Sequence, residues 1–173
     1  FPDTTGFGGS FAFPNIPVGF NYKVMPEKNM EPLNGVTTFD MVLMSKHVLG
    51  VKKLDTPFKI ISADVNKSGT VTTMDIVELR KMILMINTDF PDNKSWRFVE
   101  KSHQFVNADN PFSPPFPETL EVEDFTQDEL EANFTGVKIG DVNNTALPNS
   151  LMKSDDRGLF DDLIFIADNQ EVR

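Results

Sequence analysis

One stretch of sequence decides the fold: Asp64-Val65-Asn66-Lys67-Ser68-Gly69-Thr70-Val71-Thr72-Thr73-Met74-Asp75. Oxygen-bearing side chains stand at positions 1, 3, 5 and 9 of this twelve-residue loop, with glycine at position 6 and a carboxylate at position 12. Alternate residues of a tight loop point inward, so the oxygens at positions 1, 3 and 5 converge on one point. Gly69 permits the sharp turn that a Cβ atom would obstruct. An EF-hand-like loop of this kind supplies the oxygen ligands that a hard cation such as Ca²⁺ requires.

The pattern assigns a role to each ligand of this main site. Side-chain oxygens come from positions 1, 3 and 5, a backbone carbonyl from position 7, a hydroxyl or a bridging water from position 9, and the closing carboxylate from position 12. The six predicted ligands are Asp64, Asn66, Ser68, Thr70, Thr72 and Asp75. The simpler interpretation is a solvated Asx turn before a helix, but a twelve-residue match that includes the glycine favours calcium. Because serine at position 5 is a weaker ligand than aspartate, we expect the modest affinity of extracellular modules, about 10⁻⁴–10⁻³ M.

The helix that follows the loop repeats an earlier part of the chain. Residues 36–49 and 71–84 match at an offset of 35, with Val, Thr, Thr, Asp, Val, Lys and Leu at equivalent places. Each copy has a Thr-rich start, an acid and then apolar residues at helical spacing, which predicts two helices that cover each other's apolar faces. Asp40 and Asp75 would lie near helix N-termini, where free N–H groups and the helix dipole stabilise a carboxylate. The predicted core residues are Met41, Leu43, Val48, Ile76, Leu79 and Ile83.

The calcium loop and its helix resemble a known family. Asp-Val-Asn-x-Ser-Gly-x-Val-x-x-x-Asp at 64–75, followed by Ile-Val-x-Leu-Arg-Lys-x-Ile-Leu at 76–84, resembles the second half of a type I dockerin. The resemblance covers residues 29–86. It implies a pair of calcium-loop/helix repeats, calcium-dependent folding and, in cellulosome systems, docking onto a cohesin domain. The stretches at 34–40, 95–99 and 137–143 also resemble a variant found in very large secreted surface proteins of Gram-negative environmental bacteria.

The first repeat departs from the dockerin pattern. Aligning the closing acids of the two repeats puts Asn29, Glu31 and Leu33 at positions 1, 3 and 5 of the first loop, and Leu33 cannot coordinate a cation. Residues 140–145, Gly-Asp-Val-Asn-Asn-Thr, repeat the opening half of a calcium loop without a closing acid. Because one loop lacks its start and the other lacks its end, we hypothesise a composite second site; the alternative is a plain turn that resembles Asp-x-Asn. The composite ligands would be Asp40, Asp141, Asn143 and Thr145.

The remaining segments predict short β elements and a long loop around the helices. Residues 6–26 resemble the closing strands of a carboxypeptidase-regulatory-like or Cna-B-like β-sandwich, and we expect them to form a hairpin. Between 90 and 120, prolines interrupt any helix, and bulky aromatic residues predict an ordered wrap-around loop. Strands are expected at 9–13, 20–25, 137–139 and 163–167, and a helical turn at 128–133. The predicted fold class is α+β: a dockerin-like pair of calcium-loop/helix repeats flanked by short β segments and a long Phe/Pro-rich loop.

Three segments follow from these elements. Residues 1–28 would be the closing strands of a β-sandwich-like segment, 29–147 the dockerin-like module with its wrap-around loop, and 148–173 a linker with the first strand of a following domain. The sequence begins at Phe1 without an initiator methionine, so we expect a mature or excised piece of a multidomain protein.

Composition excludes several functional classes. The formal net charge of −10 over 173 residues disfavours nucleic acid and membrane surfaces as partners. The absence of cysteine excludes disulfides, thiolate metal sites and cysteine nucleophiles, and no apolar run is long enough for membrane insertion. His47 stands on the first predicted helix, where packing is the favoured interpretation. The sequence contains no phosphate-binding loop, nucleophile elbow or pair of metal-ligating histidines, so we expect no enzyme activity.

These observations lead to a function and an alternative. We expect a non-catalytic, calcium-binding spacer of a secreted bacterial adhesin or cell-surface protein, with neighbouring β-domains of the same polypeptide as its partners. The alternative is a docking module that binds a cohesin-like or surface-anchoring protein and tethers an attached enzyme. Where dockerins present their cohesin-reading residues, this chain has Thr38-Phe39 and Thr73-Met74. An exposed apolar patch on the two helices would favour docking, and burial of that face by residues 105–116 would favour the spacer.

Overall fold

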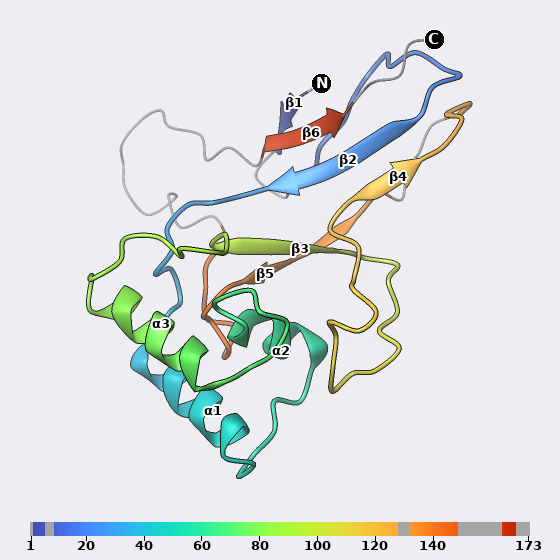
Figure 1. Cartoon of the computed structure of the whole chain (residues 1–173). Helices are drawn as coiled ribbons and strands as arrows, with labels where there is room; N and C mark the ends of the chain where they lie inside the picture. The colour runs from blue at the N-terminus through green and yellow to red at the C-terminus, as the bar shows by residue number, and fades with distance from the viewer. Residues whose placement is uncertain (1, 6–8, 128–131, 149–163, 169–173) are drawn as a thin grey trace.

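The computed structural model describes residues 2–5, 9–127, 132–148 and 164–168, and these residues form both helices and sheets (Figure 1). The predicted α+β class is confirmed. The helices lie on one side of a two-stranded ribbon and a four-stranded sheet lies on the other (Figure 1). In chain order the elements are β1 (Pro2–Thr4), β2 (Tyr22–Glu27), α1 (Thr38–Val48), α2 (Pro57–Ala63), α3 (Thr73–Ile83), β3 (Trp96–Glu100), β4 (Leu120–Val122), β5 (Phe134–Lys138) and β6 (Ile164–Asp168).

The repeated helices α1 and α3 begin and end in the same way. Thr37 and Thr72 are their N-caps, and each forms a capping box with the aspartate three residues later. Each helix ends in a left-handed residue, Gly50 with φ 68° and Met85 with φ 56°. The following amide closes back onto the last turn in both copies: that of Val51 donates to the Lys46 carbonyl, and that of Ile86 to the Lys81 carbonyl. The repeat in sequence is therefore a repeat in local structure.

The main hydrophobic core lies between α1, α3 and the two loops that precede them. Of the predicted core residues, Leu79 is fully buried, while Met41, Leu43, Ile76 and Ile83 are partly buried against the cluster. Val48 is half-buried. The pattern missed Met44 and Met82, which are fully buried. Ile139 and Val142 add to the same cluster from the far end of the chain, so the helices pack on residues that follow β5.

A second, smaller core lies under the two-stranded sheet of β3 and β5. Its buried members are Ile61 of α2, Val99, Phe116 and Val137, with Phe105 and Phe112 packed against them. The segment at 90–120 was predicted to be an ordered loop without regular structure. It contains β3, which pairs antiparallel with β5 from Trp96↔Lys138 to Glu100↔Phe134. The strand predicted at 137–139 corresponds to the end of β5.

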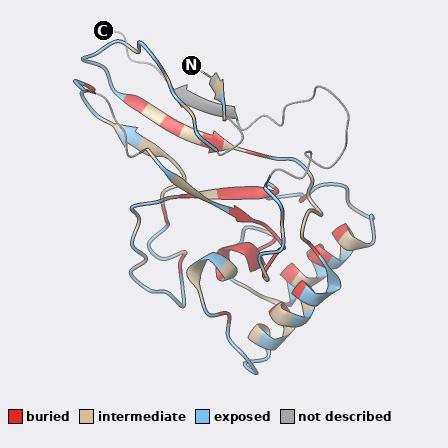
Figure 2. Cartoon of the chain, turned by 180° about the vertical axis from the view of Figure 1, so that it is seen from behind, coloured by how far each residue is buried: buried red, intermediate tan, exposed pale blue. Residues whose placement is uncertain are grey.

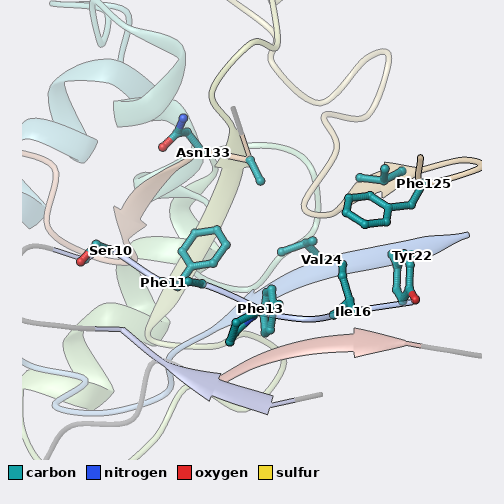
Figure 3. Close-up of a pocket in the computed structure, with 13 residues that line it drawn as sticks. Ser10, Phe11, Phe13, Ile16, Tyr22, Val24, Phe125 and Asn133 are labelled. Atoms are coloured by element: carbon teal, nitrogen blue, oxygen red, sulfur yellow. The ribbon is translucent and has the colours of Figure 1, made fainter. Parts of the chain in front are cut away.

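The four-stranded sheet corrects the predicted N-terminal hairpin. Its strand order is β1-β6-β2-β4, so β2 pairs with β6 and β4 rather than with residues 9–13, which form no strand. Buried and half-buried residues alternate along β2 (Figure 2). Phe11, Phe13 and Ile16 lie beside Tyr22 and Val24 and line a cavity of about 400 Å³ (Figure 3). The segment therefore packs its aromatic rings over the sheet instead of pairing with β2, because β6 and β4 occupy both sides of that strand.

The sheet draws strands from all three predicted segments. β6, predicted near 163–167, lies between β1 and β2, with Met25 opposite Ile166 and Glu27 opposite Ile164. The boundaries at 28 and 147 stay predictions. The helical turn predicted at 128–133 lies largely outside the described residues. Among the described helices, none has the length and apolar character of a membrane span.

Two glycines with similar backbone angles offer a test of this packing. Gly140 has φ 84° and a Cβ there would lie 2.6 Å from Leu79 Cδ1, whereas Gly50 has φ 68° and nothing within 4 Å. Gly50→Ala should lower the free energy of unfolding by about 1–2 kcal/mol through left-handed strain alone. Gly140→Ala should lower it by clearly more, because the fully buried Leu79 has no free space to move into. Chemical denaturation of both variants checks this, and equal losses would contradict the packing of residue 140 on α3.

Candidate metal centre

The predicted main loop connects the end of α2 to the start of α3. Asp64 is the C-terminal cap of α2, and Thr72 is the N-cap of α3. Val65 is buried in the main core and anchors the start of the loop. The side-chain amide of Asn93 donates to the Asp64 carbonyl at 3.0 Å and fixes the same place from outside. The loop is therefore held at both ends by packed elements.

The opening half of the loop is wrapped around the Asp64 carboxylate. Its Oδ1 accepts from the Ser68 amide and its Oδ2 from the Gly69 amide, both at 2.9 Å. The Asn66 Oδ1 accepts from the Ser68 amide at 3.0 Å. The Ser68 hydroxyl donates to the Thr70 carbonyl at 3.1 Å. The oxygens predicted at positions 1, 3, 5 and 7 are thus gathered in one place.

The closing Asp75 joins the loop to the helix. Its Oδ2 accepts from the Thr72 amide at 2.8 Å and from the Thr72 hydroxyl at 3.1 Å, which forms the capping box of α3. Its Oδ1 accepts from the Asn66 amide at 3.1 Å. One carboxylate therefore orders both the third loop residue and the first turn of the helix.

The composite second site has the same opening half, supplied from the far end of the chain. Asp141 Oδ1 accepts from the Thr145 amide at 3.0 Å, and Oδ2 accepts from the Ala146 amide at 2.7 Å. The Thr145 hydroxyl lies 2.9 Å from both the Gly35 carbonyl and the Asn143 Oδ1, and its single proton is available to either acceptor. These contacts bring the three late residues of the predicted composite site together.

The first repeat closes this arrangement through Asp40. The Oδ1 of Asp40 accepts from the Val142 amide at 2.9 Å and from the Asn143 amide at 3.2 Å. Its Oδ2 accepts from the amide and the hydroxyl of Thr37, each at 2.8 Å. Asp40 therefore caps α1 and accepts from the amide of residue 143, just as Asp75 caps α3 and accepts from the amide of residue 66.

The two arrangements correspond position by position. Residues 141–146 take the place of positions 1–6, and residues 35–40 take the place of positions 7–12 of the in-line loop at 64–75. The backbone matches at position 4, because Lys67 and Asn144 are both left-handed with φ 56° and 58°. It differs at the next left-handed residue, which is Gly69 at position 6 of the first arrangement and Gly35 at position 7 of the second. We call 64–75 the in-line loop and the pair of segments 35–40 and 141–146 the split loop.

The residues that alignment placed in the first loop have other partners. Asn29 Oδ1 accepts from the Ser95 amide at 2.8 Å, and Leu33 packs against the main core. Asn34, at the glycine position, exchanges two hydrogen bonds with the backbone of Leu147. This departure from the dockerin pattern leaves room for residues 141–146 to supply the missing half of the loop.

The aspartates of both loops are buried. None of the salt bridges among the described residues includes the carboxylate of Asp40, Asp64, Asp75 or Asp141. Burial raises the pKa of Asp64, and the nearby Asp75 charge adds to this, against the Gly69 and Ser68 amides that lower it. A buried charge is normally paired with an opposite charge or bound to a metal. The buried acids, each at most 2% exposed, are Asp40, Asp64, Asp75 and Asp141.

The donor set has the chemistry of a hard-cation site. Within the described residues no group of three or more His, Cys, Asp or Glu side chains gathers. Each loop offers two carboxylates together with amide, hydroxyl and carbonyl oxygens, which suit Ca²⁺ better than soft or imidazole-seeking metals. The hydrogen bond of His47 goes to neither set of ligands, because its Nδ1 accepts from the Leu54 amide at 3.1 Å. This contact ties the end of α1 to the following loop. Burial lowers the pKa of His47.

Sequence reasoning missed two members of the split loop and one neighbour. The Gly35 carbonyl stands at position 7 and Thr37 at position 9, and the offset of 35 from Thr70 and Thr72 was the signal that could have found them. Lys138 was missed because an isolated lysine in a strand gives no sign of burial.

Comparison of the chain with family models, with curated proteins and with solved structures gives no match.

Lys138 is a buried cation beside the split loop. Its ammonium donates to the Pro32 carbonyl at 2.6 Å and to the Ile139 carbonyl at 3.0 Å, and it lies 5.4 Å from the centre of the Phe90 ring. Burial lowers the pKa of Lys138 to about 7, against the carboxylates of Asp141, Glu31 and Asp40 that raise it. Its hydrogen bonds go to carbonyls, so it is not paired directly with either acid of the split loop.

The lowered pKa of Lys138 makes stability depend on pH. Between pH 7 and the ordinary lysine pKa of 10.5, the unfolded chain binds a proton that the folded chain has lost. The free energy of unfolding should therefore rise with pH over this window, by up to about 1 kcal/mol per pH unit, and Lys138 should contribute no slope below it. Denaturation from pH 6 to 10 at fixed calcium checks this. Lys138→Met should remove the rise, whereas Lys52→Met, at an exposed lysine, should keep it; equal slopes in both variants would contradict the assignment.

Proposed function

We propose that this chain is a non-catalytic, dockerin-like calcium-binding module. The observation that carries the proposal is the same hydrogen-bond pattern around two pairs of fully buried aspartates. In each pair one carboxylate is wrapped by the amides of positions 5 and 6, and the other accepts from positions 3 and 9. The described residues also gather no histidine or cysteine with these acids.

The physical argument rests on charge. Removing an ionised carboxylate from water costs several kcal/mol unless an opposite charge compensates it. A divalent cation in each loop would neutralise one pair of aspartates. Calcium at a hundred times its dissociation constant would add about 2.7 kcal/mol to the free energy of unfolding, a large share for a small domain.

The expected affinity supports a location. Ser68 and Thr145, both hydroxyl side chains, occupy position 5 of the two loops, where aspartate would bind calcium more strongly. A site of about 10⁻⁴–10⁻³ M works where calcium is millimolar. We therefore propose a secreted or cell-surface protein, with the module next to further β-domains of the same polypeptide.

The in-line loop gives the direct test of calcium binding. Calcium should raise the melting temperature of the wild-type chain, and Mg²⁺ at the same concentration should raise it less, because Mg²⁺ dehydrates reluctantly and demands stricter geometry. Asp75→Asn should reduce the calcium-dependent shift, since it removes the closing charge. Asp92→Asn, at an exposed acid outside both loops, is the matched control. A wild-type melting temperature that does not respond to calcium would end the proposal.

Docking is the second candidate function, and one observation favours it over a spacer. The outer faces of α1 and α3 carry exposed apolar residues in pairs related by the offset of 35. Phe39 and Met74 are each 54% exposed, and Val42 and Val77 are 46% and 45% exposed. The aromatic residues of the wrap-around loop pack elsewhere: Phe105 contacts Phe58 and Phe116, and Phe112 and Phe116 join the smaller core. The face that dockerins use for cohesins is thus left open.

The spacer role retains its own support. The helical module leaves the four-stranded sheet after β2, and β6 returns to the same sheet after the module. Because β2 and β6 are neighbours in one sheet, a rigid, calcium-loaded insert at this place would project from that sheet and hold a fixed position relative to any β-domain that the sheet belongs to. Both roles use the same two calcium loops, and they differ only in whether the outer helix face has a partner.

Substitution of the outer face distinguishes the two roles. The double variant Phe39→Glu/Met74→Glu should lose binding to a cohesin-like domain or to a surface protein of the producing cells, because two buried charges would oppose the contact. Its calcium-dependent melting shift should remain, since neither side chain is a ligand. Val106→Glu, at an 81% exposed residue outside the face, is the control for pull-downs with calcium and with chelator. Equal capture by the double variant, the control and the wild type would favour the spacer.

A further inference from the structure

The split loop joins two segments that lie far apart in the chain. Residues 35–40 lead into α1, and residues 141–146 follow β5. Every hydrogen bond of the Asp40 Oδ1 goes to the late segment, and the Thr145 hydroxyl reaches back to the Gly35 carbonyl. The in-line loop holds the same oxygens within one continuous stretch. Of the two loops, the split loop is therefore the one that links the beginning of the helical module to its end.

We propose that a calcium ion in the split loop is a clasp that fastens the two ends of the helical module, residues 28–35 and 141–148, to each other. This inference rests on the proposed function, because it requires that the chain binds calcium. It goes further by assigning the second ion a task that the first does not have.

Contacts beyond the loop show how the clasp extends to the ends of the module. The Asn34 side chain donates to the Leu147 carbonyl at 2.7 Å and accepts from the Leu147 amide at 3.1 Å. The Lys28 ammonium donates to the Pro148 carbonyl at 2.7 Å. These bonds align residues 28–35 with 145–148 in opposite directions, starting from the split loop.

The joint is too close for a side chain at its centre. Gly35 has φ 75°, and a Cβ there would lie 2.4 Å from the Ala146 nitrogen and 2.6 Å from its Cα. These are backbone atoms, which cannot turn aside as the end of a long side chain can. The two segments therefore meet backbone to backbone at positions 6 and 7 of the split loop.

Two forces oppose the joint between the two segments of the split loop, and a bound cation would offset both. Asp40 and Asp141 come from opposite segments and are both buried, so ionised carboxylates would push the segments apart. The Lys138 ammonium nearby offsets this only in part, because it donates to carbonyls and is not paired with either acid. Closing a long loop of chain also opposes the joint through lost entropy. A divalent cation shared by the two acids turns the repulsion into attraction and holds the joint against both.

The clasp lies at the neck between the module and the sheet. β2 ends at Glu27, directly before residue 28, and Glu27 pairs with Ile164 at the start of β6. A closed joint between residues 28 and 148 keeps the strand before the module near the strand after it. Calcium would thus set the connection of the helical module to its sheet as well as the shape of the helices.

Matched variants at position 3 test the clasp on the full chain. Asn143→Ala removes an oxygen of the split loop, and Asn66→Ala removes the equivalent oxygen of the in-line loop. Calorimetric titration of the wild type with calcium should give two binding events. Asn143→Ala should weaken one of them by at least about tenfold, and Asn66→Ala the other. Amide exchange should show that chelation or Asn143→Ala exposes the amides of residues 142–147, whereas Asn66→Ala leaves them protected.

Gly35→Ala provides a second variant that changes no side-chain ligand. Its Cβ should separate the two segments and weaken the same binding event as Asn143→Ala, while Gly50→Ala, with a similar φ of 68° and open space around it, should not. One binding event in the wild type that is lost in Asn66→Ala and unchanged in Asn143→Ala and Gly35→Ala would overturn the clasp and leave the proposed function standing. No binding event in the wild type would overturn both.

Discussion

Two pairs of buried aspartates are the constraint on which the structure depends. Each closing acid, Asp40 or Asp75, caps a helix and at the same time accepts hydrogen bonds from the loop beside it. Each opening acid, Asp64 or Asp141, organises the turn that follows it. The start of each long helix is therefore fixed by the same carboxylates whose charge must be compensated. Hydrogen bonds from amides offset part of that charge, and in the proposed function a bound cation would offset the rest.

The split loop shows that this geometry does not require a continuous chain. What the Asp64 carboxylate needs is two amides at a fixed distance, and Asp141 receives them from Thr145 and Ala146 in the same way. The second half, from position 7 to the closing acid, only has to be brought against the first. The main core does this, because Val142 and Ile139 are buried in the cluster that packs between the repeated helices.

The sequence predicted the local parts of the structure better than the distant ones. The two long helices and the burial of Leu79 follow from local spacing. The grouping of residues 141–145 with Asp40 is the distant feature that could be predicted, because the two segments are complementary halves of one motif. The partners of β2 could not be predicted, because alternation marks a strand and says nothing about residues about a hundred positions away. The segment at 9–13 alternates like a strand yet packs across the sheet, because β6 and β4 already pair with both sides of β2. Met44 and Met82 are fully buried in the main core, although the apolar pattern of the two helices did not single them out.

In the proposed function, the position of the exposed apolar residues relative to the acids would couple calcium binding to partner binding. Phe39 directly precedes Asp40, and Met74 directly precedes Asp75, so each exposed side chain stands on the first turn that its neighbouring carboxylate holds. If the charge of a pair is not compensated, the capping box and the loop are strained together, and the exposed residue moves with them. The relative positions of Phe39 and Met74 are then set by both loops at once. A partner that contacts both residues would bind a surface that exists in full only when the in-line and the split loop are both closed.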